Sequence, residues 1–352
     1  MKIAIDCRYI GKSGIGTYIE NVASIMINKY PIHQYLVITD NVNYAKGKNN
    51  VDILYTNIKP FSLKEIFSFP VKKINECDVF FTPYINLPLG IKVPVYTTIH
   101  DVIFLDLSGM VSRIGRLTRK VFIWNAVRKS KSIFTVSHFS EGRIKYHFGS
   151  NKPIVVTYCA ISNYLKKETQ TSCNKEDYYI YVGNIKKHKG LRVLVEAFNK
   201  AKKNGLSSKL YIVGDDTKFR SREEEFNEVL KTSKDVFFTG FLSNDELIAK
   251  IKSAKALVLP SFYEGFGLPP MEALYLGTNA IISDIDVFKE IYKDFPVTYF
   301  RTGDSNELAN ILLYYKGKPF DVVAVRKQID KRYNFDTVTQ VILETITNDY
   351  TI

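Results

Sequence analysis

Residues 256–277 read ALVLPSFYEGFGLPPMEALYLG and carry more information about the fold than any other stretch of this 352-residue sequence. The apolar run at residues 256–259 predicts a buried strand, and a loop with two glycines follows it. Pro270 suits the first turn of a helix and Gly277 suits its end, which predicts a helix with Glu272 in its first turn. A strand, a loop and a helix in this order indicate part of a parallel βαβ unit.

Short apolar runs alternate with helical patterns along the whole chain, as in doubly wound α/β domains. A polar segment without a pattern, residues 163–177, predicts an interdomain linker. We therefore expect two Rossmann-like domains, residues 1–165 and 166–335, that face a cleft, and a helix at 336–352 that packs on a domain surface or crosses the cleft. The predicted strands are residues 3–5, 35–38, 53–55, 79–81, 95–99, 133–136 and 154–156, followed by 179–182, 210–213, 236–238, 256–259, 280–283 and 297–300.

The composition limits the class of protein. Hydrophobic residues make up 45% of the chain and charged residues 24%, which excludes disorder and a disulfide-rich miniature. The 49 Lys and Arg residues exceed the 36 Asp and Glu residues, and the formal net charge of +13 calls for nucleic acid, a phosphorylated substrate or a membrane surface as a partner.

The cysteines and the N-terminus indicate a location. Neither metal-ligand nor disulfide-framework spacing is present, which fits a reducing compartment. The N-terminus lacks the pattern of a signal peptide, and no stretch reaches the roughly 18 apolar residues of a membrane span. We therefore expect a cytoplasmic protein. The four scattered cysteines are Cys7, Cys77, Cys159 and Cys173.

The loop at residues 260–267 carries candidate binding groups. In an open parallel sheet, the loop after a strand lies at the carboxyl edge, where ligands bind. Its glycines allow backbone N–H groups to approach a ligand closely, and Glu264 and Glu272 can accept hydrogen bonds from two sets of sugar hydroxyls. The alternative is that Glu272 only complements the helix dipole and Glu264 is a solvated loop residue.

The order Glu264-Gly-Phe-Gly-Leu-Pro-Pro-Met-Glu272 resembles the E-x7-E motif of family 4 of the retaining glycosyltransferases, which have the two-domain GT-B fold. The resemblance covers nearly the whole chain. It implies that Glu264 contacts the donor sugar and that Glu272 binds the ribose hydroxyls of the nucleotide. The backbone contacts to the donor sugar would come from Gly265, Phe266, Gly267 and Leu268.

A second motif, YVGNIKKHKG at residues 181–190, precedes a predicted helix. The N–H groups at a helix N-terminus and the ammonium groups before it form a site for an anion such as a diphosphate. The motif resembles the family's V-G-x5-K-G element, which implies that Asn184 and Lys189 lie at the donor phosphates. Many family members have Arg where this chain has Asn184, so the charge would be met by Lys189, with His188 or Lys187 as further candidates. A lysine-rich exposed loop is the alternative.

A third motif, SGIGTY at residues 13–18, follows the first predicted strand and opens a helix predicted over residues 20–29. The absence of a third glycine argues against an ordinary dinucleotide fingerprint. The resemblance implies that this loop faces the cleft, with Gly14 and Gly16 near the donor phosphates and the acceptor.

A histidine completes the predicted site. His100 follows the predicted strand at residues 95–99, again at a carboxyl edge, although a lone histidine is more often a packed or surface residue. The resemblance implies that its imidazole reaches the sugar near the reacting carbon. We therefore predict His100 and Glu264 as the catalytic residues.

The positive charge is concentrated in residues 108–150, which hold nine Lys and Arg residues against one acid, Glu141, for a net charge of +8. A predicted helix at 110–129 has arginines at three-residue spacing on one face and apolar residues on another, which is typical of a helix lying at an anionic membrane surface. The alternative is a solvated basic face over a buried apolar stripe. The predicted apolar side is Ile114, Leu117, Val121, Phe122, Trp124 and Val127. The predicted membrane-docking residues are Arg113, Arg116, Arg119 and Lys120.

These observations favour a retaining glycosyltransferase of polysaccharide or lipopolysaccharide biosynthesis. It would move a hexosyl or deoxyhexosyl group, of the mannose, rhamnose, glucose, galactose or GlcNAc type, from a nucleoside diphosphate sugar to a glycan or lipid-linked glycan. A nucleotide-sugar epimerase or phosphorylase of GT-B fold, and a non-catalytic nucleotide-sugar binding subunit, are the alternatives.

The sequence also argues against some partners and indicates a surface for binding. No nucleic-acid-binding motif is present, so we expect no nucleic acid partner. We expect no metal cofactor, because the only D-x-D match, Asp284 to Asp286, lies beyond the motif helix. The protein would be cytoplasmic, with the inner face of the cytoplasmic membrane as a candidate surface for peripheral binding.

Overall fold

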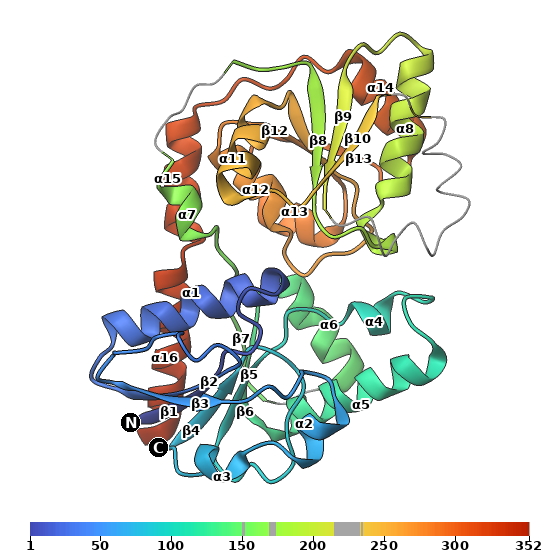
Figure 1. Cartoon of the computed structure of the whole chain (residues 1–352). Helices are drawn as coiled ribbons and strands as arrows, with labels where there is room; N and C mark the ends of the chain where they lie inside the picture. The colour runs from blue at the N-terminus through green and yellow to red at the C-terminus, as the bar shows by residue number, and fades with distance from the viewer. Residues whose placement is uncertain (150–151, 169–173, 215–232, 234, 352) are drawn as a thin grey trace. The chain divides into compact units, whose positions relative to one another are not determined.

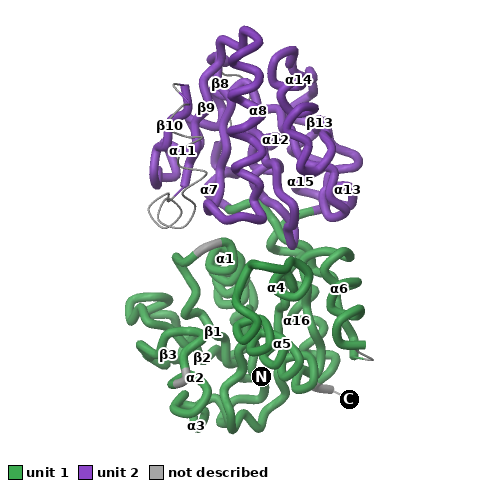
Figure 2. Tube along the Cα trace, turned by 90° about the vertical axis from the view of Figure 1, so that its right-hand side faces the viewer, with its two compact units in different colours: residues 1–162, 333–352 green, residues 163–332 purple. Residues whose placement is uncertain are grey.

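The computed structural model describes residues 1–149, 152–168, 174–214, 233 and 235–351. The chain forms two compact units: Met1–Ser162 with Tyr333–Ile352, and Asn163–Arg332 (Figure 2). Cys173 and part of the predicted linker lie outside the described residues.

Unit 1 is built on a seven-stranded sheet in the order β3-β2-β1-β4-β5-β6-β7, in which every neighbouring pair is parallel (Figure 1). The central strands are buried along nearly their whole length, because both faces of a parallel sheet are covered. Its strands are β1 (Lys2–Asp6), β2 (Gln34–Thr39), β3 (Val51–Tyr55), β4 (Val79–Thr82), β5 (Val95–Thr98), β6 (Ser130–Thr135) and β7 (Ile154–Val156).

The helices of unit 1 include the C-terminal helix of the chain. That helix, α16, packs against α1 and β6, and it buries Val338, Ile342 and Ile346. The Ser132 hydroxyl of β6 donates to the Asp349 carboxylate at 2.8 Å. The chain therefore returns to the unit in which it began. The helices are α1 (Ser13–Lys29), α2 (Leu63–Phe67), α3 (Val71–Ile74), α4 (Ile103–Asp106), α5 (Arg113–Lys129), α6 (His138–Phe148) and α16 (Phe335–Thr351).

Unit 2 has a six-stranded parallel sheet in the order β10-β9-β8-β11-β12-β13. Helix α8 packs against α14, and α12 packs on β11 and β12. The strands are β8 (Tyr178–Val182), β9 (Lys209–Val213), β10 (Val236–Gly240), β11 (Ala256–Leu259), β12 (Asn279–Ser283) and β13 (Val297–Phe300). The helices are α7 (Asn163–Lys166), the 3₁₀ helix η1 (Lys187–Lys189), α8 (Leu191–Lys203), α11 (Asn244–Ser253), α12 (Leu268–Tyr275), α13 (Asp286–Tyr292), α14 (Ser305–Tyr314) and α15 (Val322–Arg332).

Both sheets confirm the predicted fold class, and all thirteen predicted strands are present. Each strand order reverses once, between β1 and β4 in unit 1 and between β8 and β11 in unit 2. In doubly wound sheets a ligand binds at the carboxyl end of the strands that flank such a reversal. The loops after β8 and β11 are therefore the expected position of a ligand-binding site in unit 2.

Candidate active site

Two loops of unit 2 meet at its reversal point. The loop after β8 ends in η1 and leads into α8, and the loop after β11 leads into α12. The backbone N–H of Phe262 donates to the carbonyl of His188 at 2.7 Å. Gly190 has a φ of 67°, and a Cβ there would lie 1.9 Å from the Pro260 carbonyl oxygen. Only glycine fits at this position, so the close contact between the two loops depends on it.

Lys189 and Glu264 form an ion pair across these loops. The Lys189 Nζ lies 2.6 Å from both carboxylate oxygens of Glu264, and the Ser261 hydroxyl donates to Oε1 at 2.7 Å. The Glu264 side chain is only 8% exposed and that of Lys189 is 19% exposed. Two residues predicted for different parts of the donor, sugar and phosphate, are therefore one coupled unit in this structure.

His188 precedes Lys189 in the same loop. Burial, with Lys189 and Lys186 nearby, lowers the pKa of His188 to about 3, and its side chain is buried. In the free protein the imidazole is therefore neutral at pH 7, and Lys189 is the basic group that the loop places beside Glu264.

The turn after Glu264 is supported by α13. Gly267 has a φ of 87°, and a Cβ there would lie 2.4 Å from a ring carbon of Phe288. The Tyr292 hydroxyl donates to the Gly267 carbonyl and accepts a hydrogen bond from the Met271 N–H at 3.1 Å. The Phe266 side chain is buried, so a ligand would meet the backbone of this turn.

Helix α12 begins at Leu268, two residues before Pro270. Glu272 therefore lies in the second turn, and its predicted place in the first turn is wrong. The helix starts earlier because Gly267 adopts the left-handed conformation that turns the chain into it. Gly277 follows the end of the helix as predicted, with a φ of 80°.

The Glu272 carboxyl has a raised pKa. Burial raises the pKa of its carboxyl to about 7. Burial, with Glu272 nearby, also raises the pKa of the Tyr164 phenol. Tyr164 lies on α7, inside the predicted linker, and no local pattern marks it as a neighbour of residue 272. Tyr164 is therefore a neighbour of the predicted Glu272 that sequence reasoning missed in unit 2.

Asn184 and three glycines line the carboxyl ends of the neighbouring strands. Asn184 is exposed, and its carbonyl accepts a hydrogen bond from the Tyr181 hydroxyl at 3.1 Å. A Cβ on Gly214 would lie 2.3 Å from the Gly183 carbonyl oxygen, and the Gly214 N–H donates to the Gly240 carbonyl at 3.2 Å. The backbones of these glycines are therefore packed together at this edge of the sheet.

His100 lies in unit 1, in the loop after β5. Its Nε2 lies 3.1 Å from the carbonyl oxygen of Pro83, and its ring contacts Tyr18 edge-on at 4.9 Å. Because a carbonyl can only accept, Nε2 carries the proton, and Nδ1 of the neutral ring is an acceptor. Burial lowers the pKa of His100 to about 4. The residue can therefore accept a hydrogen bond from a hydroxyl without carrying a positive charge at neutral pH.

Gly14 and Gly16 lie in a helix and not in a loop. Helix α1 begins at Ser13, so the predicted start at residue 20 is wrong. Gly16 is buried, and a Cβ there would lie 2.2 Å from the Tyr9 carbonyl oxygen. This contact accounts for the glycine and lets the helix begin early. Gly14 is exposed on the first turn, where a Cβ would have no neighbouring atom within 4 Å.

A buried charge network lies at the reversal point of unit 1, and sequence reasoning did not find it. The Arg8 guanidinium donates to Asp6 at 2.9 and 2.6 Å and to Glu65 at 2.5 Å. The Tyr84 hydroxyl donates to Asp6 at 2.8 Å. All four side chains are buried. The network fixes the chain after β1, which leads into α1. The only feature of the local sequence that pointed to it is the pair of opposite charges, Asp6 and Arg8, at the end of β1.

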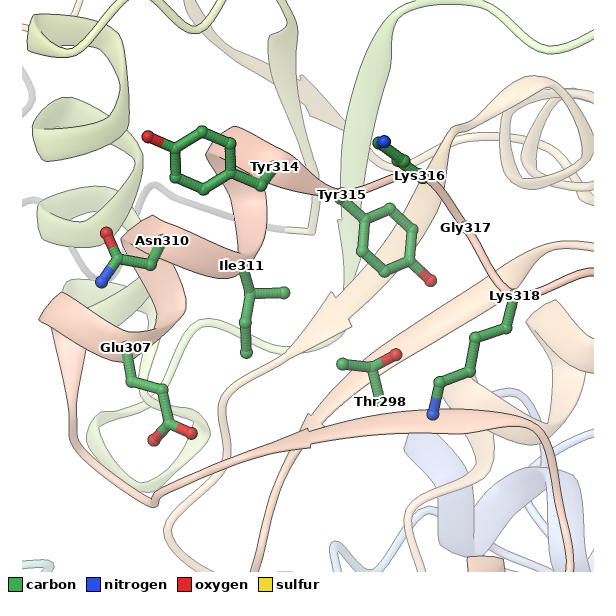
Figure 3. A pocket seen from close by; sticks show the side chains of 9 residues that line it. All are labelled: Thr298, Glu307, Asn310, Ile311, Tyr314, Tyr315, Lys316, Gly317 and Lys318. Carbon is green, nitrogen blue, oxygen red and sulfur yellow. The ribbon is translucent and has the colours of Figure 1, made fainter.

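A pocket of about 450 Å³ lies elsewhere in unit 2, beside β13 and α14 (Figure 3). It contains none of the predicted site residues. Thr298 lies within β13 and not at its carboxyl end, so the pocket is separate from the reversal point. Its lining is Thr298, Glu307, Asn310, Ile311, Tyr314, Tyr315, Lys316, Gly317 and Lys318.

The predicted docking residues lie on α5 in unit 1. Arg113, Arg116 and Lys120 are exposed, and Arg119 is half-buried. The Arg116 guanidinium also donates to the Leu105 carbonyl, and the Arg119 guanidinium lies 4.4 Å from the centre of the Phe104 ring. Within the described part of the chain, no helix is both long and apolar enough to cross a membrane.

Residues 165–315 match the family model of the group 1 glycosyl transferases. The chain is 30% identical over 250 residues to the O-antigen chain mannosyltransferase RfbU of Salmonella typhimurium, a match that covers 70% of this chain and 67% of that protein. It is also 30% identical over 215 residues to a glycogen synthase of Mycobacterium tuberculosis, covering 58% of this chain and about half, 49%, of the synthase.

The structure is similar to that of Alr3699/HepE from Anabaena, solved in complex with UDP-glucose, with a TM-score of 0.75 and 17% identity over 99% of this chain and all of that one. The two parallel-sheet units, together with this likeness, show the GT-B fold. The chain belongs to the group 1 glycosyl transferases and is a glycosyltransferase enzyme.

Proposed function

We propose that this enzyme transfers a hexosyl group from a nucleoside diphosphate sugar to a hydroxyl of a glycan or lipid-linked glycan, with retention of the anomeric configuration. Mannose is the first candidate among the predicted sugars, because the RfbU relative is named as an O-antigen chain mannosyltransferase. The same relative supports a role in O-antigen or another surface polysaccharide.

The observation that carries the proposal is the Lys189–Glu264 pair at the reversal point of unit 2, with the N-terminus of α8 directly after it. A leaving diphosphate gains negative charge as the sugar becomes cationic. Lys189 and the helix N-terminus would stabilise that charge, because fixed positive groups act strongly in a partly desolvated site. When Lys189 turns to the phosphate, Glu264 would be released to accept hydrogen bonds from the sugar.

The remaining residues would orient the donor. The backbone of residues 265–268 would contact the sugar, and Glu272 would accept hydrogen bonds from the ribose. Asn184 would lie toward the phosphates. We place His100 at the sugar as well, with its Nδ1 accepting a hydrogen bond from a sugar hydroxyl.

The reaction needs no separate base. The bond from the anomeric carbon to the phosphate oxygen breaks, and the acceptor oxygen forms a new bond to the same carbon on the same face. The acceptor proton passes to an oxygen of the leaving diphosphate, which gives a glycoside and a free nucleoside diphosphate. Basic side chains would take the place of a divalent ion in this scheme.

The test is transfer from GDP-mannose, with UDP-glucose and dTDP-rhamnose as competitors, to a lipid-linked oligosaccharide, followed by NMR of the product linkage. We expect acceptor-dependent release of nucleoside diphosphate and a retained anomeric configuration. His100→Ala should lower kcat by about a hundredfold, since misplacement of a reacting sugar has effects of this order, with nucleotide affinity unchanged.

Two results would contradict the proposal. Inversion of configuration would exclude the retaining scheme. Loss of transfer in EDTA that Mg²⁺ restores would exclude the metal-independent one. Donor turnover without acceptor would instead favour an epimerase, and dependence on inorganic phosphate would favour a phosphorylase.

A further inference from the structure

Helix α5 of unit 1 has two apolar faces, and only one of them is buried. Ile123, Ala126 and Val127 are buried, and Ile123 and Val127 pack with Ile99 and Leu105 in one core cluster. A second set of apolar residues is exposed, and its spacing of three, four and three residues places it in one stripe along the helix. The stripe consists of Ile114, Leu117, Val121 and Trp124, which are 79%, 63%, 50% and 49% exposed.

The exposure of these four residues favours the interfacial interpretation of the sequence. A solvated basic face over a buried apolar stripe requires these four residues to face the core, and the structure places them in solvent. Four large apolar side chains in eleven residues form a continuous patch, and such patches mark interaction sites in soluble proteins. The patch therefore needs a partner.

The charges around the stripe select that partner. Arg113, Lys120 and Arg128 lie within about one third of a helical turn of the stripe, because successive residues are rotated by about 100°. The Arg128 guanidinium lies 5.4 Å from the centre of the Trp124 ring. Among the described residues, none of these three has an acidic partner within ion-pair distance. The partner must offer both an apolar phase and negative charge.

A second copy of the chain does not meet this requirement. A symmetric dimer brings the same surface patch of both copies together. It would therefore juxtapose two segments of residues 108–150, each with a net charge of +8. An anionic lipid surface has the opposite charge and an apolar interior within reach of short side chains.

We propose that α5 docks unit 1 on anionic lipid surfaces, with Ile114, Leu117, Val121 and Trp124 inserted among the acyl chains and Arg113, Lys120 and Arg128 at the headgroups. Figure 1 shows α5 at the periphery of unit 1, beside α4 and α6. This surface differs from the one predicted from sequence. Arg116 and Arg119 turn toward Leu105 and Phe104 and support the helix on the body of the protein.

The chain carries its own probe for this interaction, because Trp124 is its only tryptophan. The full-length protein would be mixed with phosphatidylglycerol-containing vesicles and with pure phosphatidylcholine vesicles. We expect co-flotation with the anionic vesicles, a blue shift of Trp124 emission and its quenching by brominated acyl chains. Binding should weaken as salt is raised, since salt screens the charges.

Matched variants locate the surface. Leu117→Ser with Val121→Ser, and separately Lys120→Glu with Arg128→Glu, should each lower partitioning into anionic vesicles at least tenfold. Phe67→Ser removes a similarly exposed apolar side chain from α2 in the same unit, and Arg119→Gln removes one inward-facing charge. Both controls should bind vesicles nearly as well as the wild type. Circular dichroism of each variant checks that it is folded.

Three outcomes would overturn the proposal. One is vesicle binding without a blue shift or quenching of Trp124. Another is unchanged binding by the Leu117 and Val121 double variant. The third is a blue shift that grows with protein concentration in the absence of lipid, which would identify a second copy as the occupant. None of these measurements depends on which sugar is transferred, so their failure is distinct from failure of the proposed function.

Discussion

At the scale of single residues, the Lys189–Glu264 pair has two uses. It holds two loops together in the free protein, and it keeps the ammonium group of Lys189 beside the proposed phosphate position. Breaking a buried ion pair leaves an unpaired charge in a poorly solvated place, and this is more damaging than removing both partners. The pair therefore predicts a specific pattern of stability in its variants.

Lys189→Met should destabilise the protein by about 2–4 kcal/mol, because Glu264 is left buried without its cation. Glu264→Gln in the Lys189→Met background should recover part of this loss, so the two changes are non-additive. Urea unfolding of both single variants and of the double variant measures the coupling. Lys186→Met, at an exposed lysine of the same loop, is the control and should change stability little. Additive effects would show that the pair is not coupled.

Glu272 gives a prediction about pH. Its folded pKa of about 7 lies above the ordinary value of 4.5. Between these values the native state holds more protons than the unfolded state, so stability falls as pH rises from about 4.5 to 7, by roughly 1–3 kcal/mol. In Glu272→Gln, the free energy of unfolding measured with urea should change much less between pH 4.5 and 7.

The same carboxyl should make nucleotide binding depend on pH. Ribose hydroxyls donate to the ionised carboxylate, so affinity for the nucleoside diphosphate should rise up to about pH 7 in the wild type and much less in Glu272→Gln. Isothermal titration calorimetry at several pH values measures both. An affinity that does not change over this range would remove Glu272 from the nucleotide site.

At the scale of elements, glycines decide where helices begin and how loops meet. Gly190→Ala should destabilise the protein by about 2 kcal/mol or more, because φ is positive there and the new Cβ would collide with the Pro260 carbonyl. Gly142 lies inside α6 with nothing within 4 Å of a Cβ position. Gly142→Ala should therefore stabilise the protein by about 0.5–1 kcal/mol. Thermal unfolding of both variants tests the contrast, and equal effects would contradict it.

The elements also show what the sequence could and could not predict. Each of the thirteen strands contains a short run of apolar or β-branched residues, so all were found from local pattern. The start of α1 was missed because Gly16 lowers helix propensity locally but is required by its contact with the Tyr9 carbonyl. The two faces of α5 could not be separated, since both carry apolar residues and only the packing of Ile123 and Val127 shows which one is buried.

The same limit applies to the site. Glu264, Lys189 and His100 were found because each follows a strand in a recognisable motif. The ion pair between residues 75 positions apart, the raised pKa of Glu272 and its neighbour Tyr164 depend on tertiary packing. Local sequence contains no signal for these contacts.

At the scale of the whole molecule, the chain path makes the two units unequal. Unit 2 is one continuous segment, whereas unit 1 is completed only when α16 returns to it from the end of the chain. Each unit has its own sheet. Trp124 lies in unit 1, and the proposed nucleotide site lies in unit 2. In the unmodified protein, Trp124 fluorescence therefore reports on unit 1, and a nucleoside diphosphate can be used to stabilise unit 2.

The two units should respond separately to ligand and to mutation. A nucleoside diphosphate at one hundred times its Kd should stabilise unit 2 by about 2.7 kcal/mol, seen by far-ultraviolet circular dichroism, with little change in the Trp124 fluorescence transition. Ile342→Ala, in the buried face of α16, should lower the stability reported by Trp124 fluorescence by about 2–5 kcal/mol. Gln340→Ala, on the exposed face of the same helix, should not. If nucleotide shifted both transitions equally, the units would unfold as one, because a ligand can stabilise only the cooperative unit that contains its site.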